Sequence, residues 1–249
     1  VATAAFAGPY VVPSSVFGQN APSNRITLGV IGCGNQSTVD IPEWLKNDDC
    51  QIVAVCDVNK ASYGYKTEKQ FLGREPQRDF VNQSYAKKTA SGLFKGCDAY
   101  ADFRDVLARK DIDAVAIITP DHWHAVMTIM AAKEGKDVYC QKPLAHTVYE
   151  ARRIAEVARD SKVQTQMGNQ GHSSEAIRLV REWIQAGAIG DVFAVNAQFS
   201  TFAEPRERGA TDSWRYQAGA AGNGHVINFG CHYIDTSRFF AGQDPVQVC

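Results

Sequence analysis

The sequence predicts an α/β protein that begins with a doubly wound parallel sheet and continues into a second, smaller domain. From residue 26 to about 162, short apolar runs alternate with helical patterns. The runs lack strict polar alternation, as expected of strands that are buried on both faces of a parallel sheet. A Gly-rich turn closes the first run, which is typical of a nucleotide-binding sheet. After Gly168 the alternation stops, and a second domain is expected there.

The elements of the first domain follow from these patterns. Strands are expected at 26–31, 51–56, 114–118, 137–140 and 163–167. Asp102 is expected to cap a short helix at 103–109, and Asp121 the helix that carries Val126. Thr147-Val-Tyr-Glu150 is a capping box that opens a further amphipathic helix. Between residues 60 and 98 we expect one helix followed by an irregular insertion.

The second domain is expected to contain a helix at about 173–187, a strand at 191–201, a loop at 203–224 and a helix at about 230–240. The chain ends inside an apolar run at 245–249 that resembles a strand cut short. We therefore divide the chain into a first domain at 25–165 and a partial second domain at 166–249.

Charge and composition are those of an ordinary globular protein. The 249 residues include 26 Lys and Arg against 27 Asp and Glu, which gives a net charge of −1 and no support for a nucleic-acid partner. No Cys/His cluster has zinc spacing, so no metal is expected. Cys33, Cys56 and Cys140 are interpreted as small apolar residues in or beside strands.

Residues 1–18 are apolar and small, without any charge. The run is too short, and too often interrupted by proline, to span a membrane. We interpret residues 1–24 as the remnant of an export leader, and an exported, periplasmic protein is expected. The alternatives are a disordered N-terminal arm and a cytoplasmic protein.

The first strand ends in Gly32-Cys-Gly34-Asn35, a turn that lets the backbone approach a pyrophosphate at the start of a helix. Ser37 stands where the third glycine of the fingerprint is common. Pro42 requires a helix that begins near Ile41 or is kinked. Asp57 ends the second strand, 25 residues after Gly32, and can accept hydrogen bonds from ribose hydroxyls. Its charge disfavours a 2′-phosphate, so the predicted cofactor is NAD rather than NADP.

Polar residues also follow the later strands. Thr119-Pro120 ends the third strand, with His122 and His124 just beyond. Lys142 ends the fourth strand and could move a proton of a substrate hydroxyl. Far downstream, Asn228 and His232 lie four residues apart, on one face if the helix begins that early. Each of these residues also has an ordinary structural interpretation, as a surface side chain or a satisfied core histidine.

Taken together, these motifs resemble the Gfo/Idh/MocA oxidoreductases, the glucose–fructose oxidoreductase and inositol dehydrogenase group, from about residue 25 to 240. The resemblance implies a Rossmann domain, a C-terminal domain with an open, mostly antiparallel sheet, and pairing with another copy of the chain in a homo-oligomer. The family's Glu-Lys-Pro motif corresponds to Gln141-Lys142-Pro143, and its Asp-x-x-x-His pair to Asn228 and His232. The resemblance assigns Lys142, His232 and Asn228 to catalysis. It assigns the following residues to the cofactor side: Gly32, Gly34, Asn35, Asp57, Thr119, Pro120, His124 and Gln141.

Two departures from the family pattern stand out. Gln141 and Asn228 keep hydrogen-bonding capacity but lose the family's negative charges, which should favour a neutral Lys142. Asp235 is a candidate to replace the lost carboxylate, although its direction could equally take it into the core. The sequences of residues 10–18 and of Thr119–His124 also resemble those of exported family members with twin-arginine leaders.

Three functions remain open at this stage. The first is an NAD-dependent oxidoreductase that acts on a hydroxyl or carbonyl of a carbohydrate-like small molecule. The second is a glycosidase that retains NAD and cleaves by transient oxidation and elimination. The third is a sensor that keeps the fold and the NAD site without turnover. No stable membrane insertion is expected.

Overall fold

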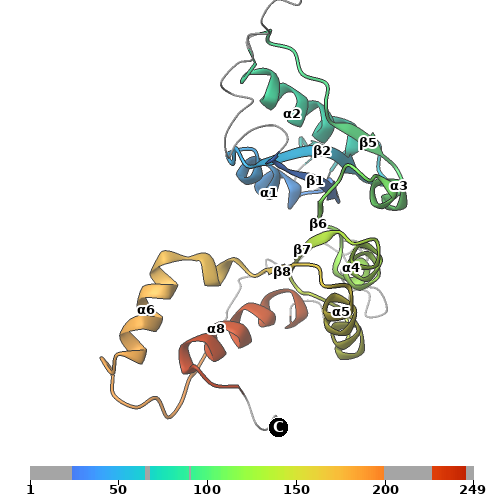
Figure 1. Ribbon diagram of the computed structural model, residues 1–249. Helices are drawn as coiled ribbons and strands as arrows, with labels where there is room; N and C mark the ends of the chain where they lie inside the picture. Colours follow the sequence, from blue (N-terminus) through green and yellow to red (C-terminus); the bar gives the residue numbers. More distant parts are fainter. Residues whose placement is uncertain (1–23, 65–67, 90, 199–225, 245–249) are drawn as a thin grey trace, which may run out of the picture. The chain divides into compact units, whose positions relative to one another are not determined.

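The computed structural model describes residues 24–64, 68–89, 91–198 and 226–244. Six strands form one sheet in the order β5-β2-β1-β6-β7-β8 (Figure 1). The strands are β1 (Ile26–Ile31), β2 (Cys50–Cys56), β5 (Asp98–Tyr100), β6 (Ala114–Ile117), β7 (Asp137–Gln141) and β8 (Thr165–Gly168). The chain divides after Ala114 into two compact units, which are described separately.

In the first unit, β1 and β2 pair in parallel with Val30 opposite Val55, and β2 pairs in parallel with β5. Val30 and Val55 are fully buried, as the apolar runs predict. The same holds for Cys33 and Cys56, and burial raises the pKa of both thiols. These cysteines therefore behave as small core residues, as the sequence indicates.

Helix α1 (Ser37–Trp44) contradicts the first of the two alternatives drawn from Pro42, a helix that begins near Ile41. The helix begins at Ser37, not near Ile41, and contains Pro42 in its second turn. It ends only two residues after the proline. A proline removes one helical N–H and crowds the carbonyl four residues earlier, which is tolerable where the helix is this short.

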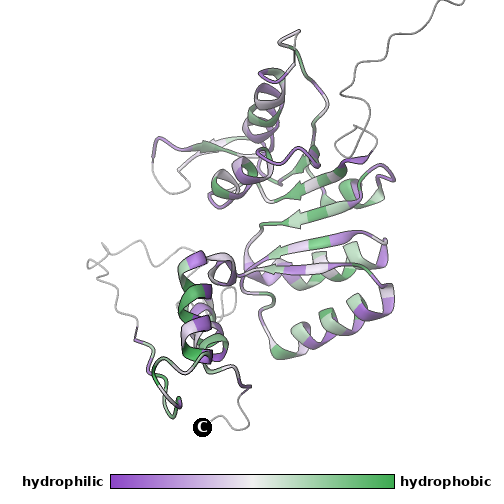
Figure 2. Cartoon of the chain, turned by 60° about the vertical axis from the view of Figure 1, so that its left-hand side comes forward, coloured by the Kyte–Doolittle hydropathy of each residue, from purple (hydrophilic) through white to green (hydrophobic). Residues whose placement is uncertain are grey.

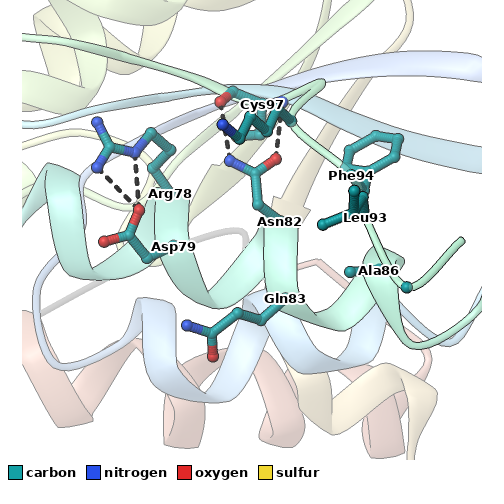
Figure 3. A pocket seen from close by; sticks show the side chains of 10 residues that line it. Arg78, Asp79, Asn82, Gln83, Ala86, Leu93, Phe94 and Cys97 are labelled. Carbon is teal, nitrogen blue, oxygen red and sulfur yellow. Dashed lines mark hydrogen bonds and ion pairs between the residues drawn. The ribbon is translucent and has the colours of Figure 1, made fainter.

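Residues 60–98 contain more regular structure than expected. The segment holds the short antiparallel pair β3 (Ser62–Tyr63) and β4 (Phe71–Leu72), then helix α2 (Arg74–Ala86) and β5. One helix is confirmed, whereas β3 and β4 were not predicted. Figure 3 shows how the Asn82 side chain both donates to and accepts from the backbone of Cys97, which ties the following loop to α2. Helix α3 (Phe103–Ala108) follows β5, and Asp102 caps it as expected.

The second unit contains β6, β7 and β8 with helices α4 (His124–Lys133) and α5 (Val148–Ser161). The predicted capping box opens α5, since Thr147 accepts from the Glu150 N–H and Glu150 accepts from the Thr147 N–H. Ile154 and Val157 of α5 are buried, and Figure 2 shows apolar and polar residues on different sides of this helix.

Asp121 does not cap α4. It begins a short 3-10 turn (Asp121–Trp123), and its carboxylate accepts from the His122 N–H at 2.9 Å. Trp123 takes the position before α4, without a side-chain cap. The aspartate therefore holds the turn that precedes the helix.

The rest of the second unit contains α6 (Glu175–Gln185), a π-helical turn (Val226–Gly230) and α8 (Cys231–Ala241). Both predicted helices are confirmed, and the Arg181 guanidinium lies over the Phe239 ring at 4.2 Å where α6 meets α8. The expected strand at 191–201 is wrong for residues 191–198, which form no strand. The remainder of that prediction, the loop at 203–224 and the segments 1–23 and 245–249 lie outside the described residues. Among the described helices, none is long and apolar enough to cross a bilayer.

Candidate active site

The Gly-rich turn after β1 has the geometry that a phosphate-approaching backbone requires. Gly32 adopts φ of 105°, a conformation that L side chains rarely adopt, and its N–H donates to the Cys56 carbonyl at 2.8 Å. Ser37 is fully buried and donates from Oγ to the Gly34 carbonyl at 2.6 Å. Serine at the third position of the fingerprint therefore fits, since its hydroxyl holds the turn against the start of α1.

Asp57 is held beside this turn. One of its carboxylate oxygens accepts from the Cys33 N–H at 2.7 Å, and the other accepts from the Asn59 N–H at 2.8 Å. Each carboxylate oxygen can accept more than one hydrogen bond, so the group keeps capacity for ribose hydroxyls. The turn, the start of α1 and this carboxylate together fit the adenosine and pyrophosphate of NAD.

Two further residues reach this region, and sequence reasoning missed both. Gln70 donates to the Asn35 side-chain oxygen at 3.0 Å, which links the segment before β4 to the Gly-rich turn. Arg74 donates to the backbone carbonyls of Asp57 and Val58 at 3.1 and 3.0 Å. No arginine follows Asp57 directly in the sequence, and only the fold places one there.

In the second unit, His124 acts as a buried brace rather than as a ligand-facing side chain. Its ring is only 1% exposed, and its two nitrogens contact the carbonyls of Pro143 at 2.6 Å and Thr119 at 2.8 Å. Burial lowers the pKa of His124, while these two carbonyl contacts oppose the change. Both ring nitrogens are engaged, so His124 would serve a cofactor only through the Thr119-Pro120 backbone that it holds.

Lys142 and Asn228 lie in direct contact. Lys142 Nζ donates to the Asn228 side-chain oxygen at 2.7 Å and to its backbone carbonyl at 2.9 Å. Partial burial lowers the pKa of Lys142. The buried Gln141 side chain accepts from the Lys142 N–H at 3.2 Å, so this glutamine fixes the backbone from which the lysine projects.

His232, one turn beyond Asn228, completes the cluster. Burial and then the charge of Lys142 lower the pKa of His232, while the charge of Asp235 opposes them. His232 Nδ1 contacts the Asn169 side-chain oxygen at 3.0 Å, and Asn169 in turn donates to Asp235 at 2.6 Å. Sequence reasoning did not single out Asn169.

A hollow of about 540 Å³ is lined by α2 and the loop before β5 (Figure 3). None of the predicted site residues lines it. Four of the lining residues pair with one another, Arg78 with Asp79 and Asn82 with Cys97. It is therefore not a candidate for the substrate site.

Comparison with known proteins decides the family. Residues 26–169 match the model of the Gfo/Idh/MocA oxidoreductase family with an NAD-binding Rossmann fold. Residues 177–249 match the GFO/IDH/MocA C-terminal domain. The chain belongs to the Gfo/Idh/MocA family. The family model is that of an NAD-binding Rossmann fold, which supports NAD as the cofactor.

The relatives of this Gfo/Idh/MocA chain include enzymes of two kinds. It is 31% identical to the levoglucosan dehydrogenase of Pseudarthrobacter phenanthrenivorans, over 57% of this chain and 36% of the relative. It is 28% identical to a glycosyl hydrolase family 109 protein of Shewanella sp. (strain MR-4), over 76% of this chain and 38% of the relative.

Among solved structures, an oxidoreductase domain protein from Kribbella flavida is 27% identical with a TM-score of 0.64, covering 88% of this chain and 54% of that one. The chain thus spans about a third to a half of the length of these relatives.

Proposed function

We propose that the protein is an NAD-dependent oxidoreductase that acts on a hydroxyl or carbonyl group of a sugar, cyclitol or related small molecule. The observation that carries this proposal is the contact of Lys142 with Asn228, one turn before His232. Two proton-handling side chains, 90 residues apart in sequence, thereby come to one place in the second unit. A purely structural lysine at a strand end would not need this arrangement.

The chemistry divides between the two side chains. NAD, when bound, accepts or returns a hydride at the substrate carbon. His232 takes the hydroxyl proton during oxidation and returns it during reduction, and a lowered pKa keeps the imidazole neutral and able to do so near neutral pH. Lys142 donates a hydrogen bond to the same oxygen and stabilises the charge that develops on it. Asn228 orients the lysine without adding charge.

A glycosidase that retains NAD is the second candidate, favoured by the similarity to glycosyl hydrolase family 109 proteins. The same residues would serve it, because transient oxidation of the sugar precedes elimination of the leaving group. A sensor that binds NAD and sugar without turnover would have no need for either proton transfer.

One experiment separates these functions. Full-length protein is purified, any bound nucleotide is identified, and sugars, cyclitols and aryl glycosides are screened with NAD at the absorbance band of reduced nicotinamide. Net NADH formation supports the dehydrogenase. Release of the aryl group without net NADH supports the glycosidase. Tight binding of NAD and sugar with neither signal supports the sensor.

We also propose that the protein is exported and that the full-length chain forms a homo-oligomer. The first proposal rests on the uncharged, small-residue composition of residues 1–18, and the second on the family resemblance. Fractionation of cells that express the intact gene, and the mass of the native protein by light scattering, test them.

A further inference from the structure

A chain of polar side chains extends from His232 into the second unit. His232 Nδ1 contacts Asn169 Oδ1 at 3.0 Å, and Asn169 Nδ2 donates to Asp235 Oδ2 at 2.6 Å. The same carboxylate oxygen lies 2.6 Å from His172 Nε2. Asn169 follows β8, whereas its two hydrogen-bond partners, His232 and Asp235, lie on α8.

The direction of the Asn169 amide follows from this arrangement. A carboxylate only accepts hydrogen bonds, so the amide nitrogen must face Asp235 and the amide oxygen must face His232. Because that oxygen also only accepts, His232 Nδ1 must carry the proton. In neutral His232 the lone pair is then on Nε2, the nitrogen that remains for a substrate proton.

We propose that Asn169 is a positioning residue that links His232 to the carboxylate of Asp235 and fixes Nε2 of His232 as the proton-accepting atom. The inference rests on the proposed function for its role in turnover, whereas the protonation of Nδ1 stands on the contacts alone. Asn228, beside Lys142, carries no charge, and Asp235 supplies a negative charge to His232 through the amide of Asn169. When His232 gains a proton, Asp235 stabilises the imidazolium through this link.

Several other charged and titratable groups face this chain. Lys142 and Cys231 lie on the side of His232, and burial is the largest cause of the lowered pKa of Lys142 and of the raised pKa of Cys231. His172 and Arg238 lie on the side of Asp235. Because these groups stay in place when Asn169 is replaced, a change seen only with Asn169 and Asp235 variants reports on the link itself.

Nuclear magnetic resonance on the full chain tests the protonation directly. Histidine is labelled with ¹⁵N, and the His232 signals are identified by their loss in His232→Gln. Wild type is expected to show Nδ1 protonated and Nε2 unprotonated in the neutral form. Asn169→Ala should shift the neutral ring toward protonation at Nε2 and lower the pKa of His232. Asn169→Asp should raise that pKa by about one unit. A wild-type ring protonated at Nε2 would overturn the proposal.

Kinetics tests the role in turnover. Asn169→Ala should lower kcat by about tenfold or more, with KM nearly unchanged. It should also move the acidic limb of the pH profile to lower pH, because the pKa of His232 falls. Asp235→Asn should act in the same direction and keeps a side chain of the same size, which guards against loss of folding. Gln170→Ala, an exposed neighbour of Asn169, is the control and should leave both readouts unchanged.

The two proposals fail in different ways. A wild-type protein without turnover, but with Nδ1 of His232 protonated, refutes the oxidoreductase and supports the link. An active wild type whose kcat and pH profile are unchanged in both Asn169→Ala and Asp235→Asn refutes the link and leaves the oxidoreductase standing.

Discussion

The candidate cofactor site of the first unit is built around a backbone turn, whereas the candidate catalytic cluster of the second unit is built from side chains. Just after the paired strands β1 and β2, the Gly32 N–H donates to the Cys56 carbonyl and the Cys33 N–H donates to the Asp57 carboxylate. Around Lys142 and His232, the decisive contacts join side chains from the ends of β7 and β8 and from α8. A site formed by a backbone turn tolerates substitutions that preserve the backbone conformation. A side-chain cluster loses a contact whenever one of its side chains is replaced.

Lys142→Ala should cause the largest change, because it removes the donor that holds the reacting oxygen. We expect kcat to fall by about 10²-fold or more, with the dissociation constant of NAD nearly unchanged. Steady-state kinetics and fluorescence titration with NADH check this. Lys133→Ala, on the exposed face of α4, is the control. If NAD affinity fell in Lys142→Ala by as large a factor as kcat, cofactor binding and catalysis would not be separated between the two units.

His124→Ala should have the next largest effect, on stability rather than chemistry. The variant loses the buried imidazole and its contacts with the Pro143 and Thr119 carbonyls, so the free energy of unfolding should fall by about 2 kcal/mol. Val126→Ala, a half-exposed position in the same helix, should cost less. Urea denaturation measures both, and an equal loss for the two variants would argue against the brace.

His124 should also contribute to the pH dependence of stability. Its pKa is lowered in the folded state, so below the unfolded value of about 6.5 the unfolded chain binds more protons. The free energy of unfolding should therefore fall as the pH drops through this value. In His124→Ala that part of the fall should be absent.

The strands β1, β2 and β6 could be predicted from the sequence because they are largely apolar runs, whereas β8 is mostly polar and exposed. β3, β4 and β5 were missed, since two or three residues carry no readable period. The expected strand at 191–201 had alternation, yet residues 191–198 form no strand and Phe193 is 99% exposed, since alternation alone does not make a strand without a neighbour that pairs with it.

The candidate site was predictable where a motif is local in sequence. Gly32 and Asp57 follow strands, and Lys142 and His232 lie in short signatures. The contact of Arg74 with the Asp57 carbonyl and the link through Asn169 were not predictable, because each joins segments that only the fold brings together.

Asp57→Ala tests the carboxylate of the first unit's candidate cofactor site. Loss of the carboxylate removes the repulsion of a 2′-phosphate, and the Arg74 guanidinium stays nearby, so the preference for NAD over NADP should narrow by about tenfold. Asp57→Asn keeps an acceptor for the Cys33 N–H and should show the part of the effect that is due to charge alone. Titration with both reduced cofactors measures the ratio. If wild type binds NADP as tightly as NAD, the proposal that Asp57 selects against the 2′-phosphate is wrong.

Gln141→Glu should have the smallest effect and tests how the second unit works without the family's carboxylates. A carboxylate beside Lys142 favours its charged form, so the pKa of Lys142 should rise. If Lys142 works as the charged donor, activity is lost when it deprotonates. The basic limb of the pH profile should then move up by about half a unit, while the acidic limb, set by His232, stays in place. Gln166→Glu, an exposed position on β8, controls for the added charge. An upward shift of the acidic limb instead would mean that Lys142 is the base, and the roles of the two side chains would have to be exchanged.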